Sequence, residues 1–453
     1  MKPIRADFKA LFEAHADEFL ADLREVLRVP SVRGAQTFEA PFGIGPKRAL
    51  ETVLAIADRM GFRTGQVGNC VGWAEYGPDE TQAPTYFGIL GHLDVVDVED
   101  DWHYPPYDLT KVDNLLYGRG VLDNKGPLLS TLFALYLIKT QKIAFEQRVR
   151  IIFGTDEESG SQDMPIYLAE HSAPYAGFTP DCKFPAVYGE RGLLDVQLAL
   201  PITDGSEQQI TAIEGQFAKS YLPDHAQLIL ADGTVKTYHG KKAPSNAPEM
   251  ADNVLPKLVA DASQLTGQTG QFYQWVAAKI GTQSTGEKLG INYQDEASGA
   301  LQLAFYGVSI EAQQLSVHLT CRYPISVTED QLLTGIKAAM LPGMTLTVKR
   351  RYPSQVTDPT LPFIQQLSAI YAADTGLDGT PVTTTGVTYA RALPNIIAFG
   401  PSFPGQKGIA HKGDEWLQFS DWQMMMQIYY DSLLAVGTGK QKSVCHKSGY
   451  PED

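Results

Sequence analysis

The sequence predicts an α/β protein with a mostly parallel mixed sheet sandwiched by helices, into which an α+β domain is inserted. Apolar strand-like runs alternate with helix-like segments up to about residue 190. Short alternating strands and turn-rich segments follow, and the helix–strand alternation resumes after Pro359. Such alternation is typical of a sheet covered on both faces. We therefore expect one discontinuous domain, residues 1–190 and 358–453, with a second domain over residues 191–357.

The elements of the first half follow from the spacing of apolar residues. Phe8, Phe12, Phe19 and Val26 recur at helical spacing, which predicts one amphipathic helix, and a second helix is expected over residues 46–60. Strands are expected over VGWAEY (71–76), TYFGILGHLDVV (85–96) and VRIIFGT (149–155), with a largely buried helix, GPLLSTLFALYLIKT (126–140), before the last. This order predicts an α/β unit whose site lies at the carboxyl ends of its strands.

The middle of the chain has a different pattern. Alternating strands such as LLDVQLAL and LSVHLTCRYP dominate it, interrupted by helices over 254–263 and 329–340. The last part returns to the first pattern, with a helix in LPFIQQLSAIYAADTG, a strand in NIIAFGP and a closing helix over 420–436.

Composition excludes several classes of function. The 453 residues carry a formal charge of −15, which argues against nucleic acid or an anionic membrane as a partner. No run approaches the roughly 20 apolar residues of a membrane span, and the first 27 residues lack the apolar core of a signal peptide. The four cysteines are scattered, without disulfide or metal-ligand spacing: Cys70, Cys182, Cys321 and Cys445. We expect a cytoplasmic protein.

Five short segments carry residues of the types that commonly bind metal ions. They are GHLDVV with His92 and Asp94, YGRGVLDNKGP with Asp123, GTDEESG with Glu157 and Glu158, TPDCKFP with Asp181, and GIAHKGDE with His411. Each alone has an ordinary explanation, such as a packed histidine, a helix cap or a turn. Together they put two imidazoles and several carboxylates at strand ends or glycine-rich loops of one domain. Such a set suits zinc, with manganese or cobalt as substitutes.

These segments, together with TYARALPNIIAFGPSFPGQKGIAHKGDE, resemble the motifs of the dinuclear-zinc exopeptidases. That family includes carnosinases, succinyl-diaminopimelate desuccinylase and aminoacylase-1, and the resemblance is closest to the PepV-type dipeptidases. The resemblance covers nearly the whole chain. It implies a zinc-exopeptidase fold, two zinc ions per chain and an inserted domain that acts as a lid.

The resemblance also implies a role for each candidate residue. Asp123 bridges both ions and has a cis peptide bond to Asn124, while His92 and Asp181 complete one ion and Glu158 and His411 complete the other. Glu157 is the general base for a zinc-bridged water, Asp94 orients His92, and Arg322 in CRYP binds the substrate carboxylate. On an extended segment, adjacent residues point to opposite sides. Glu158 can therefore bind metal while Glu157 faces the substrate, provided that a bend brings both to the cavity.

Two positions of the inserted domain depart from the family pattern. Family members carry GKxAH, whose histidine stabilises the oxyanion, whereas HGKKAPSNAP has Pro244 there. Ser220 replaces an asparagine that usually precedes a VP pair. His239 lies five residues before Pro244 and is a candidate substitute, although an ordinary strand or surface histidine is the simpler expectation. Removing one oxyanion donor can cost about 100- to 1000-fold in rate.

The resulting prediction is metal-dependent hydrolysis of dipeptides with broad specificity. Two alternatives stay open: a related metallo-amidohydrolase or deacylase that acts on a non-dipeptide amide, and a weakly active metal- or peptide-binding homologue. The intact Glu157 argues against the second, because a pure binder needs no base. We expect a small peptide substrate and a monomer, since the inserted domain is as large as the PepV lid that replaces a partner subunit.

Overall fold

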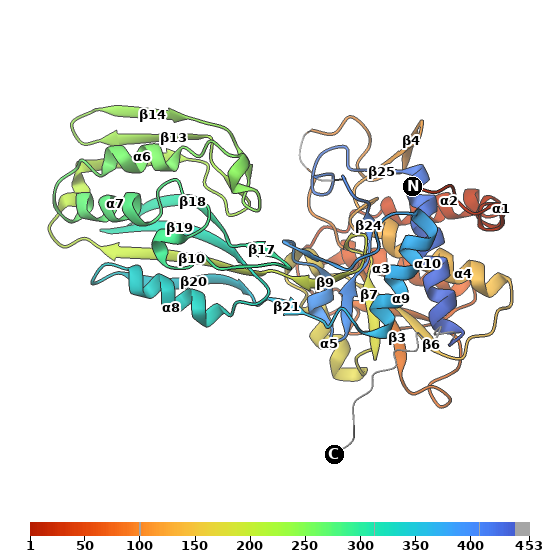
Figure 1. Ribbon diagram of the computed structural model, residues 1–453. Coiled ribbons are helices and arrows are strands. Elements are labelled where there is room, and N and C mark those ends of the chain that lie inside the picture. Colours follow the sequence, from red (N-terminus) through yellow and green to blue (C-terminus); the bar gives the residue numbers. More distant parts are fainter. Residues whose placement is uncertain (99–100, 312, 407, 440–453) are drawn as a thin grey trace, which may run out of the picture. The chain divides into compact units, whose positions relative to one another are not determined.

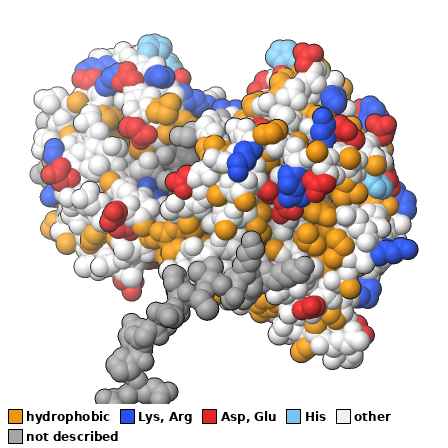
Figure 2. Space-filling model, turned by 45° about the vertical axis from the view of Figure 1, so that its right-hand side comes forward, with side chains coloured by type: hydrophobic (Ala, Val, Ile, Leu, Met, Phe, Trp, Pro, Cys, Tyr) orange, Lys and Arg blue, Asp and Glu red, His pale blue; other side chains and the backbone are white. Residues whose placement is uncertain are grey.

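The computed structural model describes residues 1–98, 101–311, 313–406 and 408–439 (Figure 1). The chain divides into two compact units. Unit 1 comprises Met1–Tyr188, Thr357–Val382 and Thr388–Asp453, and unit 2 comprises Gly189–Val356 and Thr383–Val387. Figure 2 shows acidic and basic side chains interspersed over the face that it draws.

Unit 1 is built on a mixed sheet. Its strands follow the order β1 (Arg63–Val67), β2 (Val71–Tyr76), β6 (Arg148–Gly154), β3 (Tyr86–His92), β7 (Ala176–Thr179), β23 (Ile396–Ala398) and β9 (Val187–Glu190), and β22 (Val382–Thr384) also pairs with β9. The short strand β21 (Gln355–Val356) pairs with Gly189 and Glu190, which are residues of unit 2. The four strands β6, β3, β7 and β23 are parallel to one another, while β1, β2 and β9 pair antiparallel. Every residue of β3 and β6 is buried, as expected for strands covered on both faces.

Side chains of the central strands divide between two cores. Phe87 and Ile89 of β3 join the larger core, whereas Tyr86 and Leu90 join a smaller one, because successive strand residues point to opposite faces. The larger core also receives residues from most of the helices: α1 (Ala6–Glu13), α2 (Ala16–Leu27), α3 (Ile44–Arg59), α4 (Lys125–Thr140), α9 (Pro362–Thr375) and α10 (Phe419–Gly437). The smaller core includes residues of α5 (Asp163–Glu170) and of the 3-10 turn η5 (Tyr389–Ala392).

Short elements hold the loops of unit 1 that matter for the site. Strands β4 (Thr110–Val112), β5 (Leu115–Tyr117) and β25 (Trp416–Gln418) form a small sheet, and β8 (Cys182–Lys183) pairs with β24 (Pro401–Ser402). A 3-10 turn, η1 (Glu157–Ser159), follows β6. These pairings connect the loop before α4, the loop after β7 and the loop before α10.

Unit 2 has a separate core and an α+β composition. A four-stranded antiparallel sheet runs in the order β18 (Gln302–Glu311), β19 (Gln314–Tyr323), β10 (Gly192–Pro201) and β20 (Thr345–Tyr352). A three-stranded sheet contains β11 (Ile210–Gly215), β13 (His225–Leu230) and β14 (Val235–His239), and the short pairs are β12 (Tyr221–Leu222) with β15 (Ala243–Pro244) and β16 (Gln294–Asp295) with β17 (Gly299–Ala300). The helices are α6 (Leu255–Ala262), α7 (Gly267–Lys279) and α8 (Glu329–Ala339), and all three contribute to the core.

The predicted fold class is confirmed by this architecture. Some elements differ from expectation. The predicted first helix is two helices, α1 and α2, because the backbone leaves helical geometry at His15, where φ is −124° and ψ is 0°. Helix α7 was not predicted, since its two glycines and three glutamines give a weak apolar pattern. In the described part of the chain, no helix has the length and apolar character needed to cross a membrane.

Candidate active site

The predicted ligand residues of unit 1 come from the carboxyl ends of adjacent parallel strands. His92 is the last residue of β3, Glu157 and Glu158 follow β6, and Asp181 follows β7. Because β6, β3 and β7 are neighbours with the same direction, their carboxyl ends meet at one edge of the sheet. Asp123 reaches this edge from the loop that enters α4.

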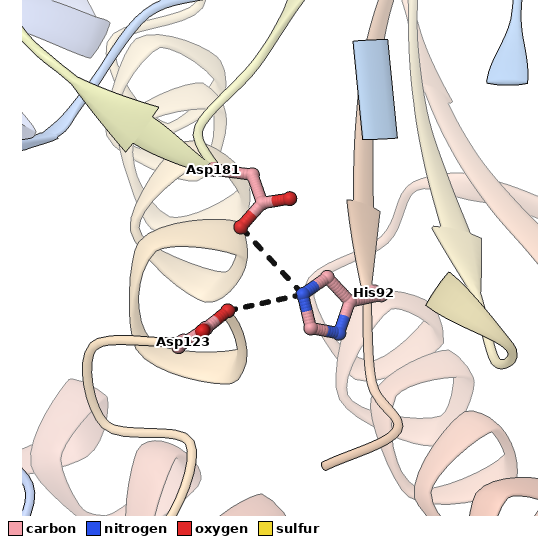
Figure 3. A group of neighbouring side chains, drawn as sticks. All are labelled: His92, Asp123 and Asp181. Atoms are coloured by element: carbon pink, nitrogen blue, oxygen red, sulfur yellow. Dashed lines mark hydrogen bonds and ion pairs between the residues drawn. The ribbon is translucent and has the colours of Figure 1, made fainter. Parts of the chain in front are cut away.

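One group of ligand-type side chains contains His92, Asp123 and Asp181 (Figure 3). The Nε2 atom of His92 lies 3.2 Å from Oδ1 of Asp123 and 3.6 Å from Oδ1 of Asp181. The imidazole is completely buried, whereas the two carboxylates are partly accessible. All three side chains therefore direct a donor atom to the same small space.

A second group contains Asp123, Glu158 and His411. Nε2 of His411 lies 3.0 Å from Oδ2 of Asp123 and 2.8 Å from Oε1 of Glu158. Asp123 thus presents one oxygen to each group, and its peptide bond to Asn124 is cis. This is the arrangement that a carboxylate shared between two ions requires.

The two adjacent glutamates do not lie on an extended segment. They occupy the 3-10 turn η1, and the carboxylate of Asp94 accepts the main-chain N–H groups of Glu157 and Glu158 at 3.2 and 3.0 Å. The turn brings both side chains to the same region, where an atom of each lies within 4.8 Å of a ring nitrogen of His92. The bend that the prediction required is therefore this turn.

Asp94 holds His92 mainly through its backbone. Nδ1 of His92 donates to the main-chain oxygen of Asp94 at 2.9 Å, and the nearer carboxylate oxygen lies 3.5 Å away. A partner on Nδ1 leaves Nε2 free to face the carboxylates, as is usual for a metal-binding imidazole. Asp94 therefore orients both His92 and the turn that carries the two glutamates.

Burial and charge shift the titration of these groups. Burial, followed by repulsion from Asp181, raises the pKa of Glu157 well above its ordinary value. Burial also raises the pKa of Asp181, to about 6, and that of Glu158. Burial lowers the pKa of His411, but hydrogen bonds to Asp123 and Glu158 outweigh this effect and raise it to about 11.

The donor set fits a pair of divalent cations. Four carboxylates and two imidazoles converge, and the carboxylates repel one another in surroundings that exclude much of the water. Concentrated carboxylates need a compensating positive charge. Mixed nitrogen and oxygen donors in two groups that share one carboxylate suit zinc, manganese or cobalt.

Comparison with known proteins decides the family. The pattern of "Peptidase family M20/M25/M40" matches residues 88–435, which is most of the chain. The chain belongs to this family. It is therefore a metallopeptidase of the M20 type, and the predicted relationship to dinuclear-zinc exopeptidases is confirmed.

Individual relatives match this chain over almost its whole length. The protein named "Putative dipeptidase SH1171" from Staphylococcus haemolyticus (strain JCSC1435) is 26% identical over 468 residues, covering 95% of this chain and 99% of its own. Human carnosine dipeptidase 1 has a similar structure, with a TM-score of 0.60, 14% identity, and 96% and 100% of the two chains covered. The YXEP protein of Bacillus subtilis, titled a dinuclear metal binding peptidase, has a TM-score of 0.53 at 11% identity, over 94% and 98% of the two chains.

Glu415 of the M20 site was not assigned a role from sequence. Its buried carboxylate accepts the main-chain N–H groups of Gly120, Leu122 and Asp123 at 3.1, 2.9 and 3.0 Å, and Arg119 donates to it at 2.8 Å. Glu415 therefore fixes the loop that carries Asp123. Its position four residues after His411 in GIAHKGDE was the available signal.

Tyr389 and Asp163 were also missed. The main-chain N–H of Tyr389 donates to Oδ2 of Asp181 at 3.3 Å, and its ring lies edge-on to His92 with centroids 6.1 Å apart. Its hydroxyl donates to Asp163, whose Oδ2 also accepts the N–H of Thr155 at 2.7 Å. This chain of contacts links the segment before Glu157 to the residues around His92 and Asp181.

The remaining predicted residues belong to unit 2. Arg322 lies on β19, where its guanidinium donates to the main-chain oxygen of Thr385. Pro244 is exposed on β15, paired with Tyr221, and Ser220 is exposed just before β12. His239 ends β14. None of these four residues belongs to the groups of ligand-type side chains found among the described residues.

Proposed function

We propose that this M20 peptidase hydrolyses dipeptides at a two-metal site in unit 1, with Glu157 as the general base. The observation that carries the proposal is the position of Asp123. One of its oxygens faces His92 and the other faces His411, so a single carboxylate joins the two ligand groups.

The residues that would hold the ions are those of the two groups. His92 and Asp181 would bind one ion, Glu158 and His411 the other, and Asp123 both. When bound, a pair of divalent cations lowers the pKa of a water molecule towards neutrality and polarises the scissile carbonyl. Zinc is the proposed ion, with manganese or cobalt able to replace it.

Glu157 is the proposed proton carrier. Its carboxylate lies beside His92 and Glu158 and keeps partial access to solvent, so a water molecule next to the ligands can reach it. The carboxylate takes a proton from the attacking water and hands it to the leaving amine, which is ordinary general acid–base work. Asp94 and Glu415 act by positioning, since they hold the η1 turn and the Asp123 loop by main-chain hydrogen bonds.

The proposed substrate is a small unblocked peptide. Relatives covering almost the whole chain are named as dipeptidases, including those of Staphylococcus haemolyticus and Bacillus subtilis. Arg322 is the proposed ligand for the substrate carboxylate, because a guanidinium suits a carboxylate through two parallel hydrogen bonds. Broad side-chain specificity, a monomeric state and a cytoplasmic location remain part of the proposal.

A panel of dipeptides tests the proposal with the zinc-loaded full chain. We expect hydrolysis of several unblocked dipeptides, complete loss of activity after dialysis against EDTA, and recovery on adding Zn²⁺, Mn²⁺ or Co²⁺. N-acylated amino acids and blocked dipeptides are the matched controls. A metal-loaded protein that leaves the dipeptides intact would refute dipeptidase activity.

A second candidate function follows from the exposed loop of unit 2. The family resemblance places an oxyanion-stabilising histidine at Pro244 and an asparagine at Ser220, so the preferred amide can differ. The candidate is a metallo-amidohydrolase or deacylase acting on a non-dipeptide amide. Cleavage of N-acylated amino acids faster than unblocked dipeptides in the same panel would favour this activity.

A further inference from the structure

Two histidines of unit 2 face each other across a β-hairpin. Figure 1 shows strands β13 and β14 side by side. His225 is the first residue of β13 and His239 is the last residue of β14, and the antiparallel register pairs them directly. Both side chains are exposed. Their Nδ1 atoms lie 3.4 Å apart, with ring centroids separated by 4.9 Å.

The separation of the two nitrogens matches a metal chelate. Two imidazole nitrogens bound to a tetrahedral zinc ion, each about 2.0–2.1 Å from it, lie roughly 3.4 Å from each other. The Nδ1 atoms of His225 and His239 have this spacing. The rings are also inclined to each other by 42°, so they do not form a parallel stack.

Polar side chains lie around His225. His225 lines a cavity of about 540 Å³ together with Glu214, Asp224 and Gln227. Glu214 of β11 pairs with Gln227 of β13, which lies two residues from His225 and on the same face of the strand. Lys242, the cation that lines this cavity, is placed with its Nζ atom 3.7 Å from the ring centroid of Tyr221. The carboxylates of Glu214 and Asp224 line the cavity with His225, but among the described residues neither forms a compact ligand group with the two imidazoles.

We propose that His225 and His239 bind a divalent transition-metal ion at the open end of this hairpin. Water molecules would complete the ligand set. Imidazole nitrogens with oxygen donors suit zinc, copper and nickel. The site shares no residue with the two ligand groups of unit 1 and goes beyond the proposed peptidase activity.

The position of the pair gives this site a structural role. Beyond His225 and His239 the chain continues through Asp224 and Gly240 towards the short strands β12 and β15, and the N–H of Gly240 donates to the main-chain oxygen of Asp224 at 2.8 Å. A metal ion held by both histidines would tie together the two segments that lead to Tyr221 and Pro244. It would therefore help to hold the segment HGKKAPSNAP, which contains β15.

Metal stoichiometry tests the proposal. The full chain, stripped with a chelator, is titrated with Zn²⁺ in equilibrium dialysis. We expect the wild-type chain to bind one equivalent more than His225→Ala or His239→Ala. The control His171→Ala removes an imidazole from unit 1 and should bind the wild-type number. Equal stoichiometry in the wild type and both hairpin variants would overturn the proposal.

A second measurement separates this site from the candidate active site. In an Asp123→Asn variant, whose active-site ions should be weakened, Ni²⁺ should still broaden the imidazole NMR signals of His225 and His239 at substoichiometric amounts. Signals that stay sharp while Ni²⁺ is added would contradict the hairpin site, whatever the activity of the enzyme. Circular dichroism verifies that the His225→Ala and His239→Ala variants are folded.

Discussion

The two units differ in how they present their polar residues. In unit 1, ligand-type side chains lie at the ends of fully buried strands, and main-chain hydrogen bonds to Asp94 and Glu415 hold their loops. In unit 2, Pro244, Ser220 and the pair His225–His239 are all exposed. The comparison indicates that unit 1 has a preorganised centre, whereas the residues of unit 2 that distinguish this chain lie on accessible loops and strand ends.

The strongest test of this contrast is Glu157→Gln in unit 1. The variant keeps the shape of the side chain but cannot accept the proton, and general base catalysis contributes about 10²- to 10⁴-fold. We expect kcat to fall by this factor while the bound metal is unchanged, as measured by steady-state kinetics and metal analysis. Glu170→Gln, at the end of α5, is the control. A variant as active as the parent would remove Glu157 from the mechanism.

The next test concerns Pro244 in unit 2. If the family resemblance holds there, Pro244→His restores an oxyanion donor, and kcat should rise by about tenfold to a hundredfold. This rise is smaller than the effect of a donor that the native fold already holds in position. Pro244→Ala is the control, because it removes the ring without adding a donor. An unchanged kcat in the histidine variant would indicate that another group already stabilises the oxyanion.

Tyr389 tests the supports of the unit 1 centre. Tyr389→Phe keeps the ring beside His92 but leaves the buried carboxyl of Asp163 without its hydroxyl partner. Removing a hydrogen-bond partner that supports metal ligands lowers metal affinity or activity by about 10- to 100-fold. For Tyr389→Phe we expect a loss of Zn²⁺ affinity of about tenfold. Isothermal titration with Zn²⁺ measures the affinity. Tyr76→Phe, which loses a hydrogen bond to the main chain of Ile143, should bind Zn²⁺ like the parent.

The smallest effect concerns a carboxyl cluster of unit 1 that lies outside the ligand groups. Asp374 is buried close to Asp431 and Arg5, and burial, followed by repulsion from Asp431, raises its pKa to about 7. A raised carboxyl pKa stabilises the fold at low pH, and this contribution is lost as the pH rises from about 4 through 7. Asp374→Asn should therefore melt a few degrees higher than the parent at pH 8.

The melting temperature as a function of pH checks this prediction. The difference between Asp374→Asn and the parent should shrink towards pH 5, where Asp374 of the parent is protonated. Asp378→Asn, which changes an exposed aspartate three residues beyond the end of α9, is the matched control. A difference that does not depend on pH would show that the ionisation of Asp374 does not limit stability.

The sequence predicted those features that depend on local pattern. Continuous apolar runs predicted the fully buried strands β3 and β6 and the buried helix α4. Residues of metal-binding types at strand ends and in glycine-rich loops predicted the segments that carry His92, Asp123, Glu158, Asp181 and His411. Glu415 and Tyr389 were not assigned. Their contacts join residues more than 200 positions apart, and the local signal for Glu415 was its position four residues after His411. The pairing of His225 with His239 depends on the register of one hairpin, which no short motif marks.

The central claim is that Asp123 joins two metal ions in unit 1. A crystal structure of the zinc-loaded protein, with anomalous diffraction at the zinc edge, tests it most directly. We expect two zinc peaks in unit 1, one bound by His92 and Asp181 and one by Glu158 and His411, with an oxygen of Asp123 on each. A single zinc ion in unit 1, or an Asp123 that contacts only one of two ions, would contradict the claim.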